Sequence, residues 1–216
     1  KFAAYVYASQ ADPADGIVMK PVTYWARGER NIGGALPLIV LTNCDEVEFH
    51  YGDLPAKRIA PDRENYPHLP RAPVVIDHRH FSQDELGLWG MTWEDVTLRG
   101  LIAGKIVTET RMIASPLPTR LEVVADDDRL LASEKDAVRV IARALDQVGS
   151  PLPFLRDPVT VRVTGPARVI GPEVLTLTGG TTGFWLETLG AAGPIGLEVS
   201  SPRFASVHLA LEAVAG

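Results

Sequence analysis

The sequence predicts an all-β protein built from two β-sandwich domains in tandem, preceded by a short helical stub. The chain of 216 residues has 19 glycines and 17 prolines, which recur between short apolar runs. That distribution is typical of many short elements joined by tight turns. Strand-like segments follow one another at short spacing in the C-terminal half. The segment Ser115–Pro118, SPLP, is the best candidate for a linker between two domains.

The first ten residues, KFAAYVYASQ, follow no clean strand pattern. Their alanine content and their lack of glycine and proline allow a short helix, which the following ADPADG would end. An isolated apolar helix of this length would have little to pack against. We therefore expect residues 1–14 to be the last turns of a domain whose body lies outside this sequence.

Residues 15–115 are expected to form the first sandwich. The run LPLIVLT is apolar throughout, which predicts a strand that is covered on both faces. The next segment, EVEFHY, alternates, with Val47 and Phe49 on one face. VTYWA, before them, also has β character. Residues 61–90 are expected to be loop with one strand at APVVID, and the segment around AGK is expected to form a hairpin.

Residues 116–216 are expected to form the second sandwich, because short strand-like runs alternate there with turns such as TGP, IGP and TGG. One segment, DAVRVIARALD, is ambiguous. Val138, Ile141, Ala142 and Leu145 have helical spacing, yet Val138, Val140 and Ala142 also alternate. We predict a strand, because both neighbouring segments are strands and a VGSP turn ends the run.

Charge and composition argue against two kinds of partner. The net charge is −6, and no stripe of lysine and arginine suggests nucleic-acid binding. No apolar stretch approaches the roughly 18 residues of a membrane span. The single cysteine excludes an internal disulfide, so the fold must depend on its apolar core.

Cys44 and a pair of histidines are the first candidates for chemistry. Cys44 is followed by Asp45 and Glu46, which would raise the pKa of its thiol, so we expect a small buried residue at a strand end. Asn43 and Asp45 are then expected to be turn residues whose side chains bond nearby backbone. His78 and His80 could share a strand face and bind a metal. Because no third ligand is evident at zinc-site spacing, we expect a solvated loop and no metal site.

No catalytic constellation is evident in the sequence. Acids are abundant, but the clusters DDD and DEVE are expected to lie in exposed turns and on strand faces, so they form no glycosidase pair. No G-x-S-x-G motif, H-E-x-x-H motif or phosphate-binding glycine loop occurs, and GGALPL precedes a strand. We therefore expect no catalytic residue and no cofactor.

The aromatic residues have two interpretations. They could form a platform on which sugars stack, or they could pack in the core and between domains, which we favour. The residues in question are Tyr24, Trp25, Trp89, Trp93 and Trp185.

Four segments together resemble the C-terminal part of glycoside hydrolase family 2 enzymes. KFAAYVYASQ is similar to that family's last barrel helix, with its Y-x-Y-x-S-Q run. LIVLTNCDEVEFHYGD resembles the family's T-N-C-D-E-V-E strand pair, which is the most specific match. TRLEVVADDDRLLASEKDAVRVIARALDQVGSPLP and VRVTGPARVIGPEVLTLTGG resemble the adjoining immunoglobulin-like domain.

The resemblance implies a β-galactosidase-like or β-glucuronidase-like parent whose two catalytic glutamates lie on a (β/α)8 barrel. It makes residues 1–14 the remnant of the last barrel helix, and residues 15–115 and 116–216 two immunoglobulin-like sandwiches. Where the family has an H-x-W-N-W run, this chain has VTYWARGERN, so Tyr24 and Trp25 are the candidate substrate-binding residues. The implied partners are the other domains of the parent hydrolase, and carbohydrate is a further candidate.

Two alternatives remain open. The chain could be a carbohydrate-binding module that uses Trp25, Trp89 or Trp93, or an adhesive sandwich with unrelated partners. Saturable glycan binding that a tryptophan-to-alanine change abolishes would favour the module.

Overall fold

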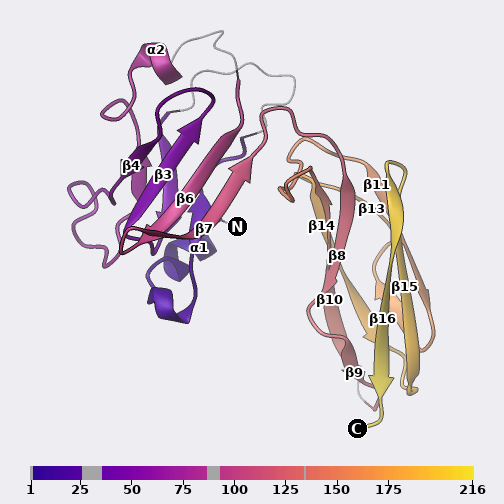
Figure 1. Cartoon of the computed structure of the whole chain (residues 1–216). Helices are drawn as coiled ribbons and strands as arrows, with labels where there is room; N and C mark the ends of the chain where they lie inside the picture. The colour runs from indigo at the N-terminus through magenta and orange to yellow at the C-terminus, as the bar shows by residue number, and fades with distance from the viewer. Residues whose placement is uncertain (1, 26–35, 87–92, 134) are drawn as a thin grey trace. The chain divides into compact units, whose positions relative to one another are not determined.

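The computed structural model describes residues 2–25, 36–86, 93–133 and 135–216, and strands dominate it (Figure 1). The predictions of an all-β fold and of a short N-terminal helix are confirmed. The chain divides into two compact units, residues 1–115 (unit 1) and 116–216 (unit 2). In the described part, no helix has the length and apolar character needed to cross a bilayer.

In the described residues, unit 1 contains two sheets, with strand orders β1-β2-β5 and β4-β3-β6-β7. Figure 1 labels the strands of the second sheet. All these strand pairs of unit 1 are antiparallel. Side chains from both sheets form one apolar core, as in a β-sandwich. Its elements are α1 (Phe2–Ala8), the 3-10 helix η1 (Pro13–Asp15), β1 (Met19–Pro21), β2 (Leu38–Thr42), β3 (Glu46–Tyr51), β4 (Lys57–Ile59), β5 (Val74–Ile76), α2 (Gln83–Leu86), β6 (Val96–Ile102) and β7 (Lys105–Met112).

The core of unit 1 follows from the period of its strands. Alternation in β3 places Val47, Phe49 and Tyr51 in the core, where each is at most 5% exposed. Phe49 packs on Phe81, with ring centroids 5.1 Å apart. In β2, every residue except Ile39 is buried, as predicted for the apolar run.

Two segments of unit 1 differ from expectation. The strand β1 ends at Pro21, so VTYWA, expected to have β character, is no strand from Val22 through Trp25; its last residue, Ala26, lies outside the described residues. The helix α2 interrupts the predicted loop beside the correctly predicted strand β5. A reciprocal pair of bonds stabilises the start of α2: Ser82 N donates to Glu85 Oε2, and Glu85 N donates to Ser82 Oγ. This S-x-x-E capping box was a readable signal.

Unit 2 contains sheets with strand orders β12-β14-β10-β8 and β13-β11-β15-β16-β9 (Figure 1). Side chains from both sheets form one apolar core. Its strands are β8 (Arg120–Ala125), β9 (Arg129–Leu131), β10 (Ala137–Leu145), β11 (Pro158–Thr164), β12 (Ala167–Ile170), β13 (Val174–Thr176), β14 (Thr181–Thr188), β15 (Gly193–Ser201) and β16 (Phe204–Val214).

The ambiguous segment of unit 2 is the strand β10, as predicted. Val138, Val140 and Ala142 are buried, whereas Arg139 between them is exposed, so the period of two decides over the helical spacing. The strand β9 pairs parallel with β16, and this pair was not predicted, because β9 has only three residues.

Candidate functional site

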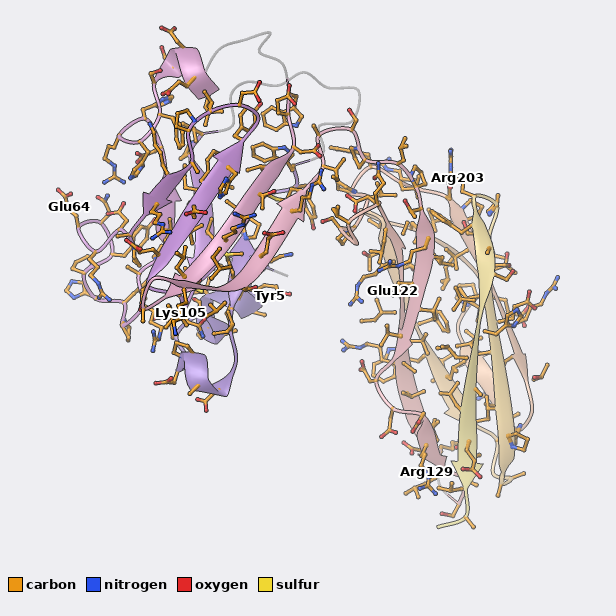
Figure 2. The ribbon with its side chains drawn as sticks, viewed as in Figure 1. Tyr5, Glu64, Lys105, Glu122, Arg129 and Arg203 are labelled. Carbon is orange, nitrogen blue, oxygen red and sulfur yellow. The ribbon has the colours of Figure 1, made fainter. Side chains whose placement is uncertain are left out.

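The helix α1 presents most of its apolar surface to solvent. None of its residues is buried: Tyr5 and Val6 are each 39% exposed, and Tyr7 is 81% exposed. Figure 2 labels Tyr5, whose ring centroid lies 5.5 Å from Lys20 Nζ. A helix this short has little stability of its own and depends on packing. Its exposed side chains are therefore a candidate contact surface.

Asn43 fastens the chain that follows α1 to unit 1. Its side chain is fully buried; Oδ1 accepts from Val18 N at 2.8 Å, and Nδ2 donates to Gly16 O at 2.8 Å and to Ala11 O at 3.4 Å. The amide thus satisfies three backbone groups that no strand reaches. The prediction of bonds to nearby backbone was wrong for Asn43, since its partners lie 25 or more residues away.

Gln10 makes a second attachment by a pair of bonds. Its Nε2 donates to Arg71 O at 2.9 Å, and its Oε1 accepts from Arg71 N at 3.0 Å. Arg71 Nη1 in turn donates to Asn43 O at 3.3 Å. We call Gln10, Asn43 and Arg71 the polar clamp. Gln10 belongs to the S-Q run and Asn43 to the T-N-C run, both of which resemble the family. Through these two residues, the runs hold the end of α1 to the sandwich.

Cys44 is a packing residue, as predicted. It is 4% exposed, and burial raises the pKa of its thiol, with a further contribution from Asp45. A Cβ placed on Gly100 would lie only 2.6 Å from Cys44 Sγ. The thiol therefore fills the space that Gly100 leaves open. Asp45 Oδ2 accepts from Ala103 N at 2.8 Å and so supports the AGK turn. The prediction of a bond to nearby backbone was therefore wrong for Asp45 too, since Ala103 is 58 residues away.

Acids on the outer face of the β3 sheet form ion pairs with arginines. Arg58, Glu48, Arg99 and Glu109 occupy directly opposite positions in β4, β3, β6 and β7, and form a charge ladder across the sheet. Arg58 Nε lies 3.0 Å from Glu48 Oε2, and Arg99 Nε lies 2.8 Å from Glu109 Oε2. The hydrogen bond from Arg58 is the largest cause of the lowered pKa of Glu48.

A second acidic group lies in the loops beside β5. Arg79 Nη2 is 2.8 Å from Asp62 Oδ2 and 2.8 Å from Asp77 Oδ2. The hydrogen bond from Arg79, together with one from Asn65, lowers the pKa of Asp62 to about 2. In the described part, every carboxyl with a shifted pKa is shifted downward. A glycosidase acid needs the opposite shift, because it must stay protonated.

The two histidines are not assembled into a metal site. His78 is exposed, and His80 Nδ1 lies 3.3 Å from Asp77 Oδ1. Among the residues that the structure describes, no group of three or more histidines, cysteines or acids could hold a metal ion.

Tyr24 and Trp25 have opposite environments. The indole of Trp25 is 4% exposed, stacks on Trp93 with centroids 4.3 Å apart, and donates from Nε1 to Glu94 O at 2.8 Å. Trp93 Nε1 donates back to Trp25 O at 3.0 Å. Tyr24 is 55% exposed, and its ring centroid lies 5.6 Å from that of Phe2 of α1. Of the two candidate residues, Tyr24 is therefore the one with a ring that a ligand could reach.

The other tryptophans differ as well. Trp89 lies outside the described residues. Trp185 of β14, in unit 2, is 48% exposed. The structure thus places Trp25 and Trp93 together in unit 1, whereas Trp185 belongs to a separate compact unit.

Comparisons with known proteins agree on one family. The family profile described as glycoside hydrolase family 2 C-terminal domain 5 matches residues 121–210. A β-galactosidase of Rhizobium meliloti is 62% identical over 181 residues, which are 84% of this chain and 24% of that protein. A β-galactosidase of Rhizobium radiobacter is 47% identical over 126 residues, which are 58% of this chain and 91% of that sequence.

The structural comparison gives the same architecture. A β-glycosidase from Bacteroides vulgatus superposes with a TM-score of 0.71 at 17% identity, covering 99% of this chain and 26% of that one. The chain spans about a quarter of the length of the first curated relatives that it matches. The matched part of these relatives is their C-terminal portion. The chain therefore belongs to glycoside hydrolase family 2, and residues 121–210 are its C-terminal domain 5.

Proposed function

We propose that this chain is the non-catalytic C-terminal part of a hydrolase that cleaves β-galactosides. Two glutamates of a (β/α)8 barrel outside these residues would carry out the retaining reaction. The observation that carries the proposal is the 62% identity to a β-galactosidase of which the chain spans 24%. The lowered pKa values of Glu48 and Asp62 support it, because both carboxylates are engaged in structural ion pairs.

Within this proposal, the three parts of the chain have different roles. Residues 1–14 would be the end of the last barrel helix, which contacts the barrel through Tyr5, Val6 and Tyr7. Residues 15–115 and 116–216 would be two immunoglobulin-like domains. The polar clamp supports the first role, because it holds α1 to unit 1 while the apolar side chains of α1 remain exposed.

Tyr24 and Trp25 would serve the substrate site in different ways. The exposed ring of Tyr24, next to Phe2, can contact a sugar that is bound at the adjoining barrel. Trp25 would be a positioning residue, because its buried ring and its bond to Glu94 O fix the backbone beside Tyr24. A Tyr24→Ala change in the whole enzyme should raise KM more than it lowers kcat, since it removes a binding contact. Tyr24→Phe should retain most of the binding.

The test is a chimera in which this chain replaces the matching part of the Rhizobium meliloti β-galactosidase. The chimera should hydrolyse an aryl β-galactoside, and the isolated chain should release no more product than buffer does. Val6→Asp combined with Tyr7→Asp should abolish the activity of the chimera, because two charges would be buried at the contact. The matched control is Val174→Asp, at a 60% exposed position of β13, which should leave activity unchanged.

Two results would contradict the proposal. One is hydrolysis by the isolated chain that disappears when one of its own carboxylates is replaced. The other is a chimera that keeps full activity with both charges in α1.

A further inference from the structure

One outer sheet face of unit 2 carries an exposed aromatic ring. In β14, burial alternates, so that Gly183, Trp185 and Glu187 share the outward face while the residues between them are buried. Directly opposite Trp185 lie Arg139 in β10 and Ile170 in β12. Side chains at such positions are neighbours, with Cβ atoms about 5 Å apart. We call these five residues the Trp185 platform.

Two platform residues, Arg139 and Glu187, form ion pairs on either side of Trp185. Arg139 Nε lies 2.9 Å from Asp126 Oδ2, and Arg168 Nη2 lies 2.7 Å from Glu187 Oε2. Trp185 therefore stands between two pairs that keep planar, charged hydrogen-bonding groups near its ring.

A third pair lies on the same face, farther along the sheet. Arg143 Nη1 is 2.9 Å from Glu122 Oε2, and Figure 2 labels Glu122 on β8. Arg143 is opposite Thr181, at the start of β14. The same face also carries Ile141, opposite Gly183, and Val124, opposite Ile141. It is thus an apolar area with ion pairs at its borders.

Space and a free donor are available beside the ring. A Cβ built on Gly183 would have one neighbour within 4 Å, the backbone oxygen of Val140, so no side chain covers this position. Among the described residues, Trp185 Nε1 has no hydrogen-bond acceptor and its ring has no aromatic or cationic partner. The residue as a whole is 48% exposed.

We propose that the Trp185 platform binds a short oligosaccharide, whose pyranose ring stacks on Trp185. A pyranose has an apolar face of C–H groups and a rim of hydroxyls. The face would cover the indole, and the hydroxyls would bond to Trp185 Nε1 and to the side chains of Arg139 and Glu187. Gly183 leaves room for the next sugar unit along β14.

A protein partner fits this surface less well. The centre of a protein–protein interface is depleted of charged residues, whereas here ion pairs border the ring on both sides. Burying those pairs under a protein would desolvate them at a cost. A polyhydroxyl ligand leaves them hydrated and uses them as hydrogen-bond partners.

The test is calorimetric titration of the 216-residue chain with short β-linked galacto-oligosaccharides and with cello-oligosaccharides. Saturable but weak binding, with a Kd of about 1 mM, is expected for at least one of them, because one aromatic stack and a few solvent-exposed hydrogen bonds each contribute little. Trp185→Ala should weaken that binding by about tenfold or more, and Trp185→Phe by less. Gly183→Val, which fills the space beside the ring, should also weaken it. Phe154→Ala, at a 56% exposed aromatic position of unit 2 outside β14, is the matched control and should leave binding unchanged.

Three outcomes would overturn the proposal. The first is the lack of saturable binding to both series of sugars. The second is binding that Trp185→Ala leaves intact. The third is self-association of the chain, measured by sedimentation, that Trp185→Ala abolishes, because the platform would then be a protein contact. None of these outcomes depends on where the hydrolytic activity resides.

Discussion

Gly100 in β6 is the position at which one added methyl group should destabilise unit 1. A Cβ there would lie 2.6 Å from Cys44 Sγ, 2.8 Å from Thr108 Cγ2 and 3.3 Å from Met19 Sδ. The first two distances are far below van der Waals contact. Gly100 also lies at the register shift between β6 and β7, so these two strands are already irregular at this point. The Gly100→Ala change should force either Cys44 or Thr108 out of position.

Overpacking of this kind costs about 2 kcal/mol of the free energy of unfolding. For a domain of this size, that lowers Tm by roughly 8 °C. The assay is thermal and urea unfolding followed by tryptophan fluorescence, since Trp25 and Trp93 lie together in unit 1. A Trp185→Phe background removes the signal of the tryptophan in unit 2, so that the transition reports unit 1.

A matched control and a double mutant make the test specific. Gly183 is also a strand glycine, but a Cβ there would meet one atom, at 3.5 Å, so Gly183→Ala should be neutral or slightly stabilising. Cys44→Ala should partly rescue Gly100→Ala, because it removes the atom at 2.6 Å. We expect the double mutant to be about 1 kcal/mol more stable than additivity gives. Strict additivity, or a Gly100→Ala protein as stable as the wild type, would refute the packing argument.

Three other changes have defined outcomes. Asn43→Asp should destabilise unit 1 by about 1–3 kcal/mol and raise hydrogen exchange at residues 16–18, because a carboxylate would replace the donor to Gly16 O; unchanged exchange would argue against the polar clamp. The pKa of Asp62 is lowered to about 2, so its contribution to stability is present above its usual pKa near 4 and is lost as the pH falls toward 2; acid titration of unfolding should show a shallower decline for Asp62→Asn. Gly165→Ala should destabilise unit 2 strongly, since φ is +90° and the new Cβ would lie 2.1 Å from Pro194 O; a melting curve that matches the wild type would contradict this.

The sequence was a good guide to the strands because burial repeats with a period of two. In β3, the alternation of Val47 and Phe49 with polar residues matches the observed burial. In β10, the same pattern decided correctly between strand and helix. Such patterns are local, so they can be read without knowing which segments pair.

The long-range contacts could not be read in this way. The role of Asn43 depends on Val18 and Gly16, which only the folded sandwich brings near it. The parallel pairing of β9 with β16 joins segments some 80 residues apart. A strand of three residues is too short to show a pattern from which this pairing could be predicted. For the candidate site, the sequence selected Tyr24 and Trp25 together, but only packing could show that one ring is exposed and the other is buried.

The polar clamp and the exposed side chains of α1 have a common consequence for assembly. A helix of seven residues is too short to be stable alone in water. The clamp holds its C-terminal end by Gln10, and Asn43 holds the chain that follows, without covering Tyr5, Val6 or Tyr7. Side chains that are already held in place lose less entropy when they bind. If α1 docks on a barrel as proposed, Gln10→Ala should weaken that docking to a separately expressed barrel. The unfolding transition of unit 1 should stay nearly unchanged, because the two bonds of Gln10 lie at the edge of the sandwich. If Gln10→Ala lowered the free energy of unfolding of unit 1 by as much as it weakened the free energy of docking, Gln10 would instead be part of the core fold.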